Sequence, residues 1–163
     1  MKVVVAIDSL KGSLTSLEAG EAIQEGILRA ISDAEVIVRP LADGGEGTVE
    51  ALTRGMNGRY EKITVTDPLG RPTDAVYGIL EDSHTAIIEM SAAAGITLID
   101  AKDRNPMNTT TYGVGEMIKD AIGKGCRHFF IGIGGSATND GGIGMLQALG
   151  YGMLDTEGKQ VSF

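Results

Sequence analysis

The sequence of 163 residues has few of the side chains that build metal sites and covalent cross-links. Its one cysteine, Cys126, excludes an intrachain disulfide and a zinc site made of thiolates, and we interpret it as a small buried hydrophobic residue. The two histidines, His84 and His128, leave few ways to build a histidine-based metal site, and we interpret both as structural. Chemistry must therefore depend on carboxylates, hydroxyls, lysine, asparagine and backbone amides.

Positive charge and long apolar runs are also scarce. Lysine and arginine total 14 against 22 aspartates and glutamates, so the net charge is −8, which excludes the broad positive field that non-specific nucleic-acid binding needs. No run of about 18 apolar residues predicts a membrane span, and the apolar part of the N-terminus is too short for a signal peptide. We expect a cytoplasmic protein that acts on small molecules, not on nucleic acid or membranes.

Strands and helices alternate at the start of the chain. The apolar run at residues 3–7 predicts a strand covered on both faces, and residues 15–18 fit a capping box that begins a helix. A second strand is predicted at 36–38, followed by a glycine-rich acidic loop at 41–47 and a helix at 48–54. This order is typical of a parallel sheet with crossover helices, so we expect an α/β fold.

The rest of the chain predicts a second α/β unit. Turn signals separate its expected strands, and we divide the chain into a first domain at 1–66 and a second at 67–163. The chain stops soon after an expected new strand, which indicates the N-terminal portion of a longer, C-terminally truncated fold. The expected elements are strands at 60–66, 74–80, 85–90, 128–133 and 150–154, helices at 114–122 and up to 149, and a turn at 155–158.

Three glycine-containing loops each follow a short apolar strand, at 8–13, 42–48 and 132–142. Loops at the carboxyl ends of strands converge on the ligand crevice of open α/β sheets, and glycine frees backbone amides to face an anion. We therefore expect phosphate binding by at least one of them. Residues 132–137 also match G-x-G-x-x-A, a dinucleotide-binding pattern, but they lie far from the N-terminal βαβ unit. No Walker A motif is present.

Charged side chains in these loops are candidates for catalysis. Asp43 and Glu46 lie three residues apart among glycines, and they can hold Mg²⁺ or accept a proton from a substrate hydroxyl. Capping of the next helix is the alternative, but it does not explain the glycines, so we favour the functional interpretation. Lys11, near Asp8, suits a carboxylate or phosphate, and a solvated surface loop explains it equally well.

Other polar residues have both a structural and a functional interpretation. Arg71 can clamp a carboxylate, or it is a surface charge at a hairpin tip. Glu89 ends an apolar strand, where a charge needs a partner or a function. Asn139 and Asp140 can cap a helix, contact a ligand, or both. Of the three threonine hydroxyls at 109–111, we expect one to cap a helix and the others to be able to contact phosphate.

Taken together and in order, these segments are specific. The chain resembles the type 1 glycerate kinase family from residue 8 to residue 142. The resemblance is carried by Asp8-Ser9-Leu10-Lys11-Gly12-Ser13, by Ala42-Asp43-Gly44-Gly45-Glu46-Gly47-Thr48, by Asp67-Pro68-Leu69-Gly70-Arg71, by Glu89-Met90-Ser91-Ala92, by Asn105-Pro106 with Thr110-Thr111-Tyr112-Gly113, and by residues 132–142.

The resemblance implies phosphorylation of D-glycerate by ATP with Mg²⁺, with 2-phosphoglycerate as the expected product and 3-phosphoglycerate as the alternative. It also implies two α/β domains, one inserted in the other, with the active site between them. Two further interpretations stay open: a domain that binds ligand without turnover, and a nicotinamide-dependent oxidoreductase built on residues 132–137. The site residues expected from this resemblance are Asp8, Lys11, Asp43 and Glu46 for catalysis, the last two also at the metal, then Arg71, Glu89, Ser91, Asn139 and Asp140 for substrate, and Gly134, Gly135, Ser136, Ala137 and Thr110 for nucleotide phosphates.

Overall fold

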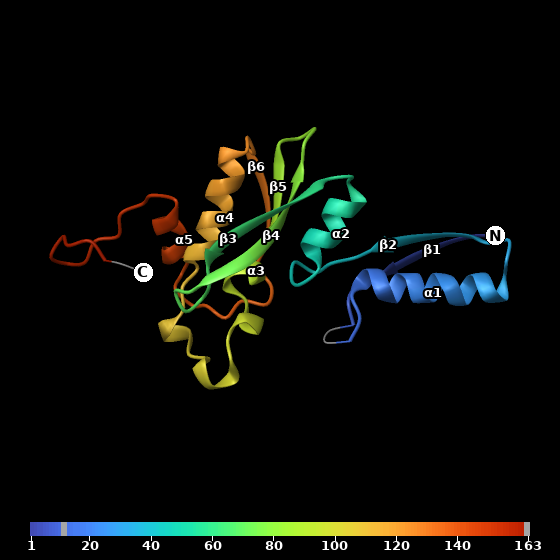
Figure 1. Ribbon diagram of the computed structural model, residues 1–163, viewed down its shortest axis with the longest axis horizontal. Coiled ribbons are helices and arrows are strands. Elements are labelled where there is room, and N and C mark those ends of the chain that lie inside the picture. Colours follow the sequence, from blue (N-terminus) through green and yellow to red (C-terminus); the bar gives the residue numbers. More distant parts are fainter. Residues whose placement is uncertain (11–12, 162–163) are drawn as a thin grey trace.

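A computed structural model describes residues 1–10 and 13–161 and confirms the α/β class. The first sheet has two parallel strands, β1 (Lys2–Ile7) and β2 (Glu35–Pro40), joined by the crossover helix α1 (Ser16–Ala30). Figure 1 shows this unit at one end of an elongated molecule, with the C-terminal segment at the other end. None of the helices in the described ranges combines the length and apolar character that a membrane crossing requires.

The expected capping box at the start of α1 is confirmed. The Glu18 amide donates to Thr15 Oγ1 at 3.1 Å, and the Thr15 amide donates to Glu18 Oε2 at 2.8 Å. Two amide donors that the helix itself cannot satisfy therefore have side-chain acceptors. The Glu18 pKa lies below its ordinary value because the backbone and hydroxyl of Thr15 both donate to its carboxylate.

The second sheet is mixed and has the order β3-β4-β5-β6. The first two pairings are antiparallel and β5–β6 is parallel. The strand at residues 59–66 pairs with β4 and therefore belongs to this sheet. The expected division into two domains at residue 66 stays a prediction. The strands are β3 (Arg59–Thr66), β4 (Pro72–Leu80), β5 (Thr85–Glu89) and β6 (His128–Gly132).

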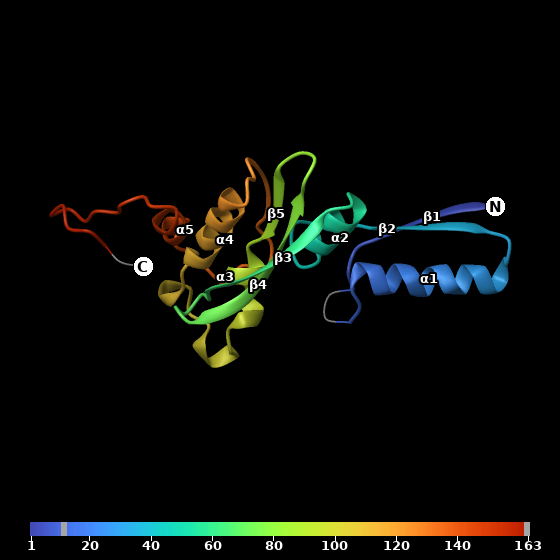
Figure 2. The ribbon, with the colours of Figure 1, turned by 45° about the horizontal axis from the view of Figure 1, so that its top comes forward.

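Helices cover both faces of the second sheet (Figure 2). On one face α4 (Tyr112–Gly123) packs against a core that includes Tyr77, Ile88 and Met117. On the other face α2 (Thr48–Gly55) contacts β4 and β5. A Cβ at Gly78 would lie 1.9 Å from Thr53 Oγ1, so the missing side chain lets α2 lie directly on the sheet.

Short helical segments complete the fold, and one expected strand is absent. Residues 150–154 form no strand; in the described chain their strand-type pairing is limited to an isolated bridge between Leu154 and Gln160. The expected turn at 155–158 is confirmed, since the Gly158 amide donates to the Asp155 carbonyl. The short segments are α3 (Ser91–Ala94), η1 (Ile96–Leu98), η2 (Ala101–Asp103), η3 (Pro106–Asn108) and α5 (Ile143–Ala148).

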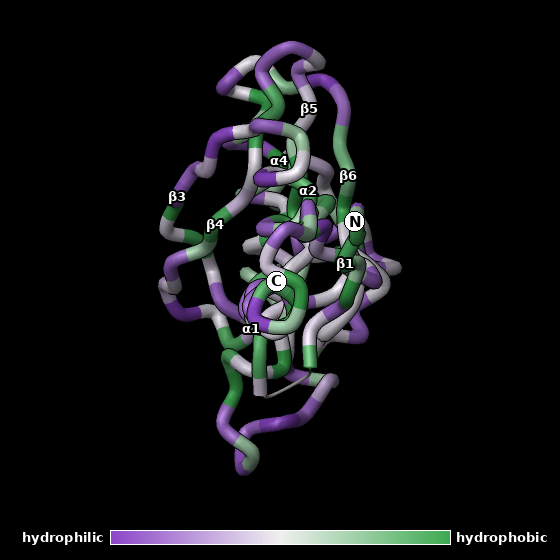
Figure 3. Tube along the Cα trace, turned by 90° about the vertical axis from the view of Figure 1, so that its right-hand side faces the viewer, coloured by the Kyte–Doolittle hydropathy of each residue, from purple (hydrophilic) through white to green (hydrophobic). Residues whose placement is uncertain are grey.

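The strand at residues 3–7, predicted to be covered on both faces, is not, and the apolar strand expected at 128–133 is also exposed. In β1, Val4 is 58% exposed, and in β6, Phe130 is 55% exposed. Figure 3 shows these hydrophobic stretches along β1 and β6. Both strands lie at sheet edges in the described chain. Their apolar runs therefore correctly predict strands, but they do not predict whether other elements pack on the two faces.

A polar network ties the second sheet to α4. The Tyr77 hydroxyl donates to Asp120 Oδ2 at 2.7 Å, and Lys124 Nζ lies 2.6 Å from the same oxygen and 3.0 Å from Glu61 Oε2. Burial, reinforced by the Asp120 carboxylate, raises the pKa of Tyr77 to about 12. The hydroxyl therefore stays a hydrogen-bond donor throughout the physiological range.

We expect Tyr77→Phe to lower the free energy of unfolding by about 1 kcal/mol, because it removes one buried donor but leaves Asp120 paired with Lys124. Urea unfolding measures the change. Tyr151→Phe is the matched control, since Tyr151 is 62% exposed in the C-terminal segment and should unfold like the wild type. Equal stability of the two variants would contradict a stabilising role for the Tyr77–Asp120 bond.

Candidate functional site

Loops at the carboxyl ends of the strands meet, as the parallel pairing predicts. Glu89 ends β5 opposite Gly132 at the end of β6, and the Met90 amide donates to the Gly132 carbonyl at 2.9 Å. The loop after β2 packs on the loop after β6, where the Gly134 amide donates to the Gly44 carbonyl at 2.9 Å. Two of the three predicted glycine loops are therefore in direct contact, although they are about 90 residues apart in the chain.

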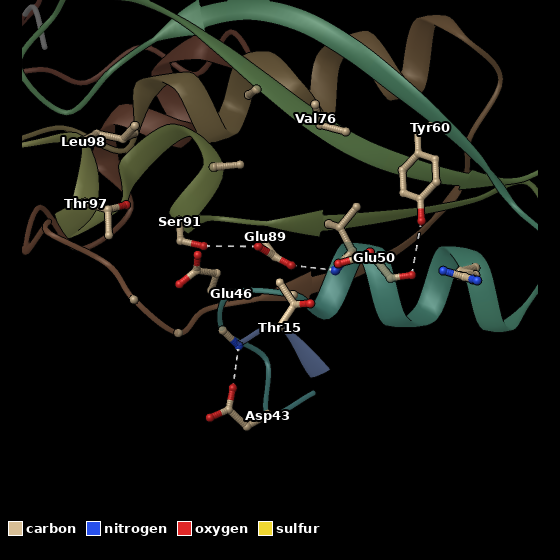
Figure 4. Close-up of a pocket in the computed structure, with 18 of the residues that line it drawn as sticks. Thr15, Asp43, Glu46, Glu50, Tyr60, Val76, Glu89, Ser91, Thr97 and Leu98 are labelled. Atoms are coloured by element: carbon tan, nitrogen blue, oxygen red, sulfur yellow. Dashed lines mark hydrogen bonds between the residues drawn. The ribbon is translucent and has the colours of Figure 1, made fainter. Parts of the chain in front are cut away.

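These loops border a cavity of about 1230 Å³. It begins at the loop after β2, passes the end of β5, and continues along α2 to β3 and β4 (Figure 4). Five carboxylate residues line it, but among the described lining residues Arg54 alone is cationic. The predicted site residues that line it are Asp43, Glu46, Glu89, Ser91, Gly134 and Gly135.

Glu89 is the buried carboxylate of the cavity, with 9% of the residue exposed. The Val49 amide, in the first turn of α2, donates to Glu89 Oε1 at 2.6 Å, and Ser91 Oγ donates to Oε2 at 3.5 Å. The N-cap residue of α2 is Gly47, which has no side chain that could accept a hydrogen bond from the first turn. Glu89, at the end of strand β5, supplies the acceptor for the Val49 amide instead. Burial, together with the charge of Glu46, raises the pKa of Glu89.

Asp43 and Glu46 present exposed carboxylates in the loop after β2, and Glu46 acts electrostatically on Glu89. Figure 4 shows Glu46 beside Glu89 and Ser91, and Asp43 bonded to the backbone of its own loop. That bond runs from the Gly45 amide to Asp43 Oδ1, at 3.0 Å. Across residues 1–10 and 13–161, no three histidine, cysteine, aspartate or glutamate side chains surround a common point that could hold a metal. Two carboxylates nevertheless suit Mg²⁺, which commonly binds one or two carboxylates together with substrate phosphates and water.

Arg71 lies outside the cavity lining and stabilises a turn. Its Nε donates to Asp67 Oδ2 at 2.7 Å, and its amide donates to Asp67 Oδ1 at 2.8 Å. Asp67 is buried and also accepts from the Leu69 amide, which completes the turn between β3 and β4. Arg71 Nη2 also reaches the carbonyl of Leu98, a residue that does line the cavity. The predicted contact of Arg71 with substrate stays a prediction.

Asp140 also lies outside the lining and holds two helix starts together. Its Oδ2 accepts from the amide and the hydroxyl of Thr111, at 2.9 and 2.8 Å, and from the Gly144 amide at 3.1 Å. Its Oδ1 accepts from the Gly142 amide at 3.0 Å. Burial opposes the charge of Asp140, but these donors outweigh it, and the pKa lies below its ordinary value.

The remaining predicted residues are dispersed. Asn139 is exposed, Thr110 Oγ1 accepts from the Tyr112 amide at 3.2 Å, and the Ser9 amide donates to Asp8 Oδ1 at 2.7 Å. Lys11 lies outside the described residues, so the structure places no side chain for it. The roles predicted for these four residues stay predictions.

The loop after β6 uses part of its backbone for packing. The Gly134 amide donates to Gly44, and the Ala137 amide donates to the Ala94 carbonyl at 2.9 Å. The next helix, α5, begins only at Ile143, so residues 132–137 do not open a helix as a dinucleotide-binding motif does. This geometry argues against the nicotinamide-dependent interpretation.

Sequence reasoning missed the part of the cavity formed by α2 and the second sheet. Tyr60 donates its hydroxyl to the Glu50 carbonyl at 3.3 Å, and Val76 and Arg54 line the same region. No motif marks these residues, because two of them lie on strands and the others on a helix, with ordinary amphipathic spacing. The sequence places Tyr60 and Val76 only as ordinary strand residues, so it offers no signal for this part of the cavity.

Fold and site together define an α/β protein with a ligand cavity at the carboxyl ends of its strands. The model of the glycerate kinase family matches residues 3–163. The chain belongs to the glycerate kinase family.

Its relatives include proteins named for this activity. The chain is 50% identical over 163 residues to a glycerate kinase of Haemophilus influenzae, which spans 100% of this chain and 43% of that protein. It is 47% identical over 163 residues to a glycerate 2-kinase of Escherichia coli, with the same coverage. A crystal structure from Salmonella typhimurium LT2, assigned as glycerate kinase 2, superposes with a TM-score of 0.87 at 48% identity, over 99% of this chain and 43% of that one. The chain thus spans less than half the length of these relatives.

Proposed function

We propose that the protein acts in the glycerate kinase reaction, the transfer of the terminal phosphoryl group of ATP to a hydroxyl of D-glycerate, with 2-phosphoglycerate as product. The observation that carries the proposal is the meeting of the loops after β2, β5 and β6 at one acidic cavity, in a chain 50% identical to a glycerate kinase. The glycerate hydroxyl oxygen attacks the terminal phosphorus, the bond to the bridging oxygen breaks, and ADP leaves. The hydroxyl proton passes to a carboxylate of the cavity.

Asp43 and Glu46 are the residues that would hold Mg²⁺. Their exposed carboxylate oxygens are the ligands that this ion prefers, and the nucleotide phosphates would complete its coordination. When bound, the ion neutralises phosphate oxygens during transfer. An acidic cavity with a single described cation favours a ligand that arrives as a metal–nucleotide complex, because free triphosphate would be repelled.

Backbone amides are the proposed phosphate donors. In the part of the chain that the structure describes, the amides of Gly135 and Ser136 donate no hydrogen bond, whereas those of Gly134 and Ala137 are used in loop packing. We therefore assign phosphate binding to Gly135 and Ser136, and glycerate binding to Ser91 and Glu89 at the end of β5, with Lys11 and Asp8 from the first loop. The other predicted residues lie outside the cavity lining, and we propose that they stabilise the surrounding loops: Asp140, Asn139, Thr110 and Arg71.

Phosphorus-31 NMR of ATP, Mg²⁺ and D-glycerate incubated with the protein tests the proposal, with L-glycerate and substrate-free samples as controls. A new phosphomonoester signal with D-glycerate supports it, and the chemical shift and coupling pattern identify the 2- or 3-position. Binding of ATP and glycerate by calorimetry without any product would instead support the ligand-binding interpretation. Absence of both binding and product would refute the proposal.

We expect Asp43→Asn to raise the Mg²⁺ concentration needed for half-maximal ATP binding by about tenfold. Asparagine keeps an acceptor for the Gly45 amide but loses the charge, so the loop is preserved while the metal ligand is weakened. Titration of ATP binding at a series of Mg²⁺ concentrations measures the effect. Asp33→Asn, an exposed carboxylate in the turn before β2, is the control. An unchanged Mg²⁺ requirement in Asp43→Asn would remove this residue from the metal site.

A further inference from the structure

The cavity is larger than the proposed acceptor requires. Ligand pockets typically measure roughly 300–1,000 Å³ and enclose a molecule of drug size. At about 1230 Å³ the cavity has room for much more than a three-carbon acid. Its extra length follows α2, whose eight residues span about 12 Å at a rise of 1.5 Å per residue. The cavity therefore connects the acidic loop at one end of α2 with a different set of residues at the other end.

Tyr60 supplies an aromatic side chain along α2, beyond the acidic loop. It lies on the edge strand β3, lines the cavity, and is 50% exposed. Its hydroxyl donates to the Glu50 carbonyl of α2, which fixes the ring between helix and sheet (Figure 4). Burial, together with the charge of Glu50, raises the pKa of Tyr60, so the ring stays neutral. A held, half-exposed aromatic ring is suited to stack on another flat ring.

The neighbours of Tyr60 favour a flat ligand that is neutral at this end. Val76, on the adjacent strand, adds a second apolar side chain to the lining and is 41% exposed. Asp74 also lines the cavity, but its charge is compensated by Lys62 Nζ, 2.7 Å away, and by the Thr64 hydroxyl. Arg54, at the end of α2, offers a guanidinium that can contact a ribose or a phosphate along the way.

We propose that Tyr60, Val76 and Arg54 form the subsite for the base and ribose of the nucleotide, with the purine ring stacked on Tyr60 and the phosphates directed along α2 toward Asp43 and Glu46. This assignment rests on the proposed function, which supplies a nucleoside triphosphate as the second substrate. The base binds beside the apolar side chains of Tyr60 and Val76, where Lys62 neutralises the charge of Asp74. The metal-bound phosphates bind at the acidic loop that carries Asp43 and Glu46. One ligand thereby occupies the length that glycerate leaves empty.

Calorimetric titration with three probes tests this subsite. Mg²⁺-ATP contains both parts of the ligand, adenosine contains only the base and ribose, and Mg²⁺-tripolyphosphate contains only the phosphates. Tyr60→Leu is expected to weaken binding of ATP and adenosine by about tenfold, as loss of a base–aromatic stack does, and to leave tripolyphosphate binding unchanged. Tyr60→Phe keeps the ring and loses only its anchor to Glu50, so it should fall between Leu and wild type.

Tyr151→Leu is the matched control, because it removes an exposed tyrosine outside the cavity lining. Urea unfolding of each variant separates folding from binding. Failure of wild-type protein to bind adenosine or ATP, or equal ATP affinity in Tyr60→Leu and Tyr151→Leu at unchanged stability, overturns the subsite. The proposed function fails separately: Tyr60-dependent ATP binding without phosphorylation of D-glycerate would retain the subsite and refute the acceptor.

Discussion

Gly134→Ala is expected to lower the free energy of unfolding by about 3 kcal/mol. A Cβ at this position would lie 2.7 Å from the Cα of Gly45 and 2.9 Å from its nitrogen. Both atoms belong to backbone, so no flexible side chain can move aside. The loop after β2 must separate from the loop after β6, and the Gly134 amide then loses its bond to the Gly44 carbonyl. The change therefore damages the fold and the cavity through the same contact.

Urea unfolding and Mg²⁺-ATP titration measure the two consequences of Gly134→Ala. Gly152→Ala is the matched control, because its Cβ would have no neighbour within 4 Å and its backbone lies outside the left-handed region. We expect the control to unfold and bind as the wild type does. A Gly134→Ala protein of wild-type stability would show that the two loops can separate at no cost, and that their glycines do not serve close packing.

The order of elements was predictable because local signals agree with the fold. The capping box of Thr15 and Glu18, the apolar runs and the turn residues each specify a boundary without help from distant parts of the chain. The loops after β2 and β6 meet as expected for glycine loops that converge on a ligand site. The two strands belong to separate sheets, so the rule for a single open sheet does not by itself explain their contact.

The partners of the buried carboxylates were not predictable. Glu89 accepts from an amide 40 residues away, and Asp140 accepts from Thr111, 29 residues away. The sequence indicated that Glu89 needed a partner or a function and that Asp140 could cap a helix, but not which segment would pack beside either one. Likewise, the apolar run of β1 does not reveal whether both faces are covered, because that depends on which helices pack on the sheet, and only α1 packs on β1 in the described chain.

The role of each glycine in the candidate site was likewise not predictable from the sequence. The clustering of the glycines predicts amides that face an anion, and in the described chain the amides of Gly135 and Ser136 donate to no protein acceptor. Gly132 and Gly134, in contrast, are small because another backbone lies against them: a Cβ at Gly132 would come within 2.4 Å of the Gly44 carbonyl oxygen. Ligand contact and close packing select the same residue type, so composition alone does not separate the two.

Asp140→Asn is expected to lower the free energy of unfolding by about 3 kcal/mol. The carboxylate accepts four hydrogen bonds and offers no donor, whereas an amide nitrogen would face N–H groups of Thr111 and Gly144 or of Gly142, whichever way it is turned. Charged hydrogen bonds contribute roughly 1.5–3 kcal/mol each when buried, and the partial exposure of Asp140 reduces their sum to the value given.

The contribution of Asp140 to stability depends on pH. Because the pKa of Asp140 is lower in the folded protein than in the unfolded chain, the unfolded chain binds more protons in the acidic window between the two values. This contribution to stability is complete above the ordinary aspartate pKa and is lost as the pH falls toward the folded-state pKa.

Urea unfolding from pH 7 into that window should therefore show a steeper loss of stability in the wild type than in Asp140→Asn. Asp82→Asn, an exposed aspartate in the turn before β5, controls for the general loss of one acidic charge. Equal slopes for all three proteins would mean that Asp140 is not the group whose protonation loosens the junction of α4 and α5.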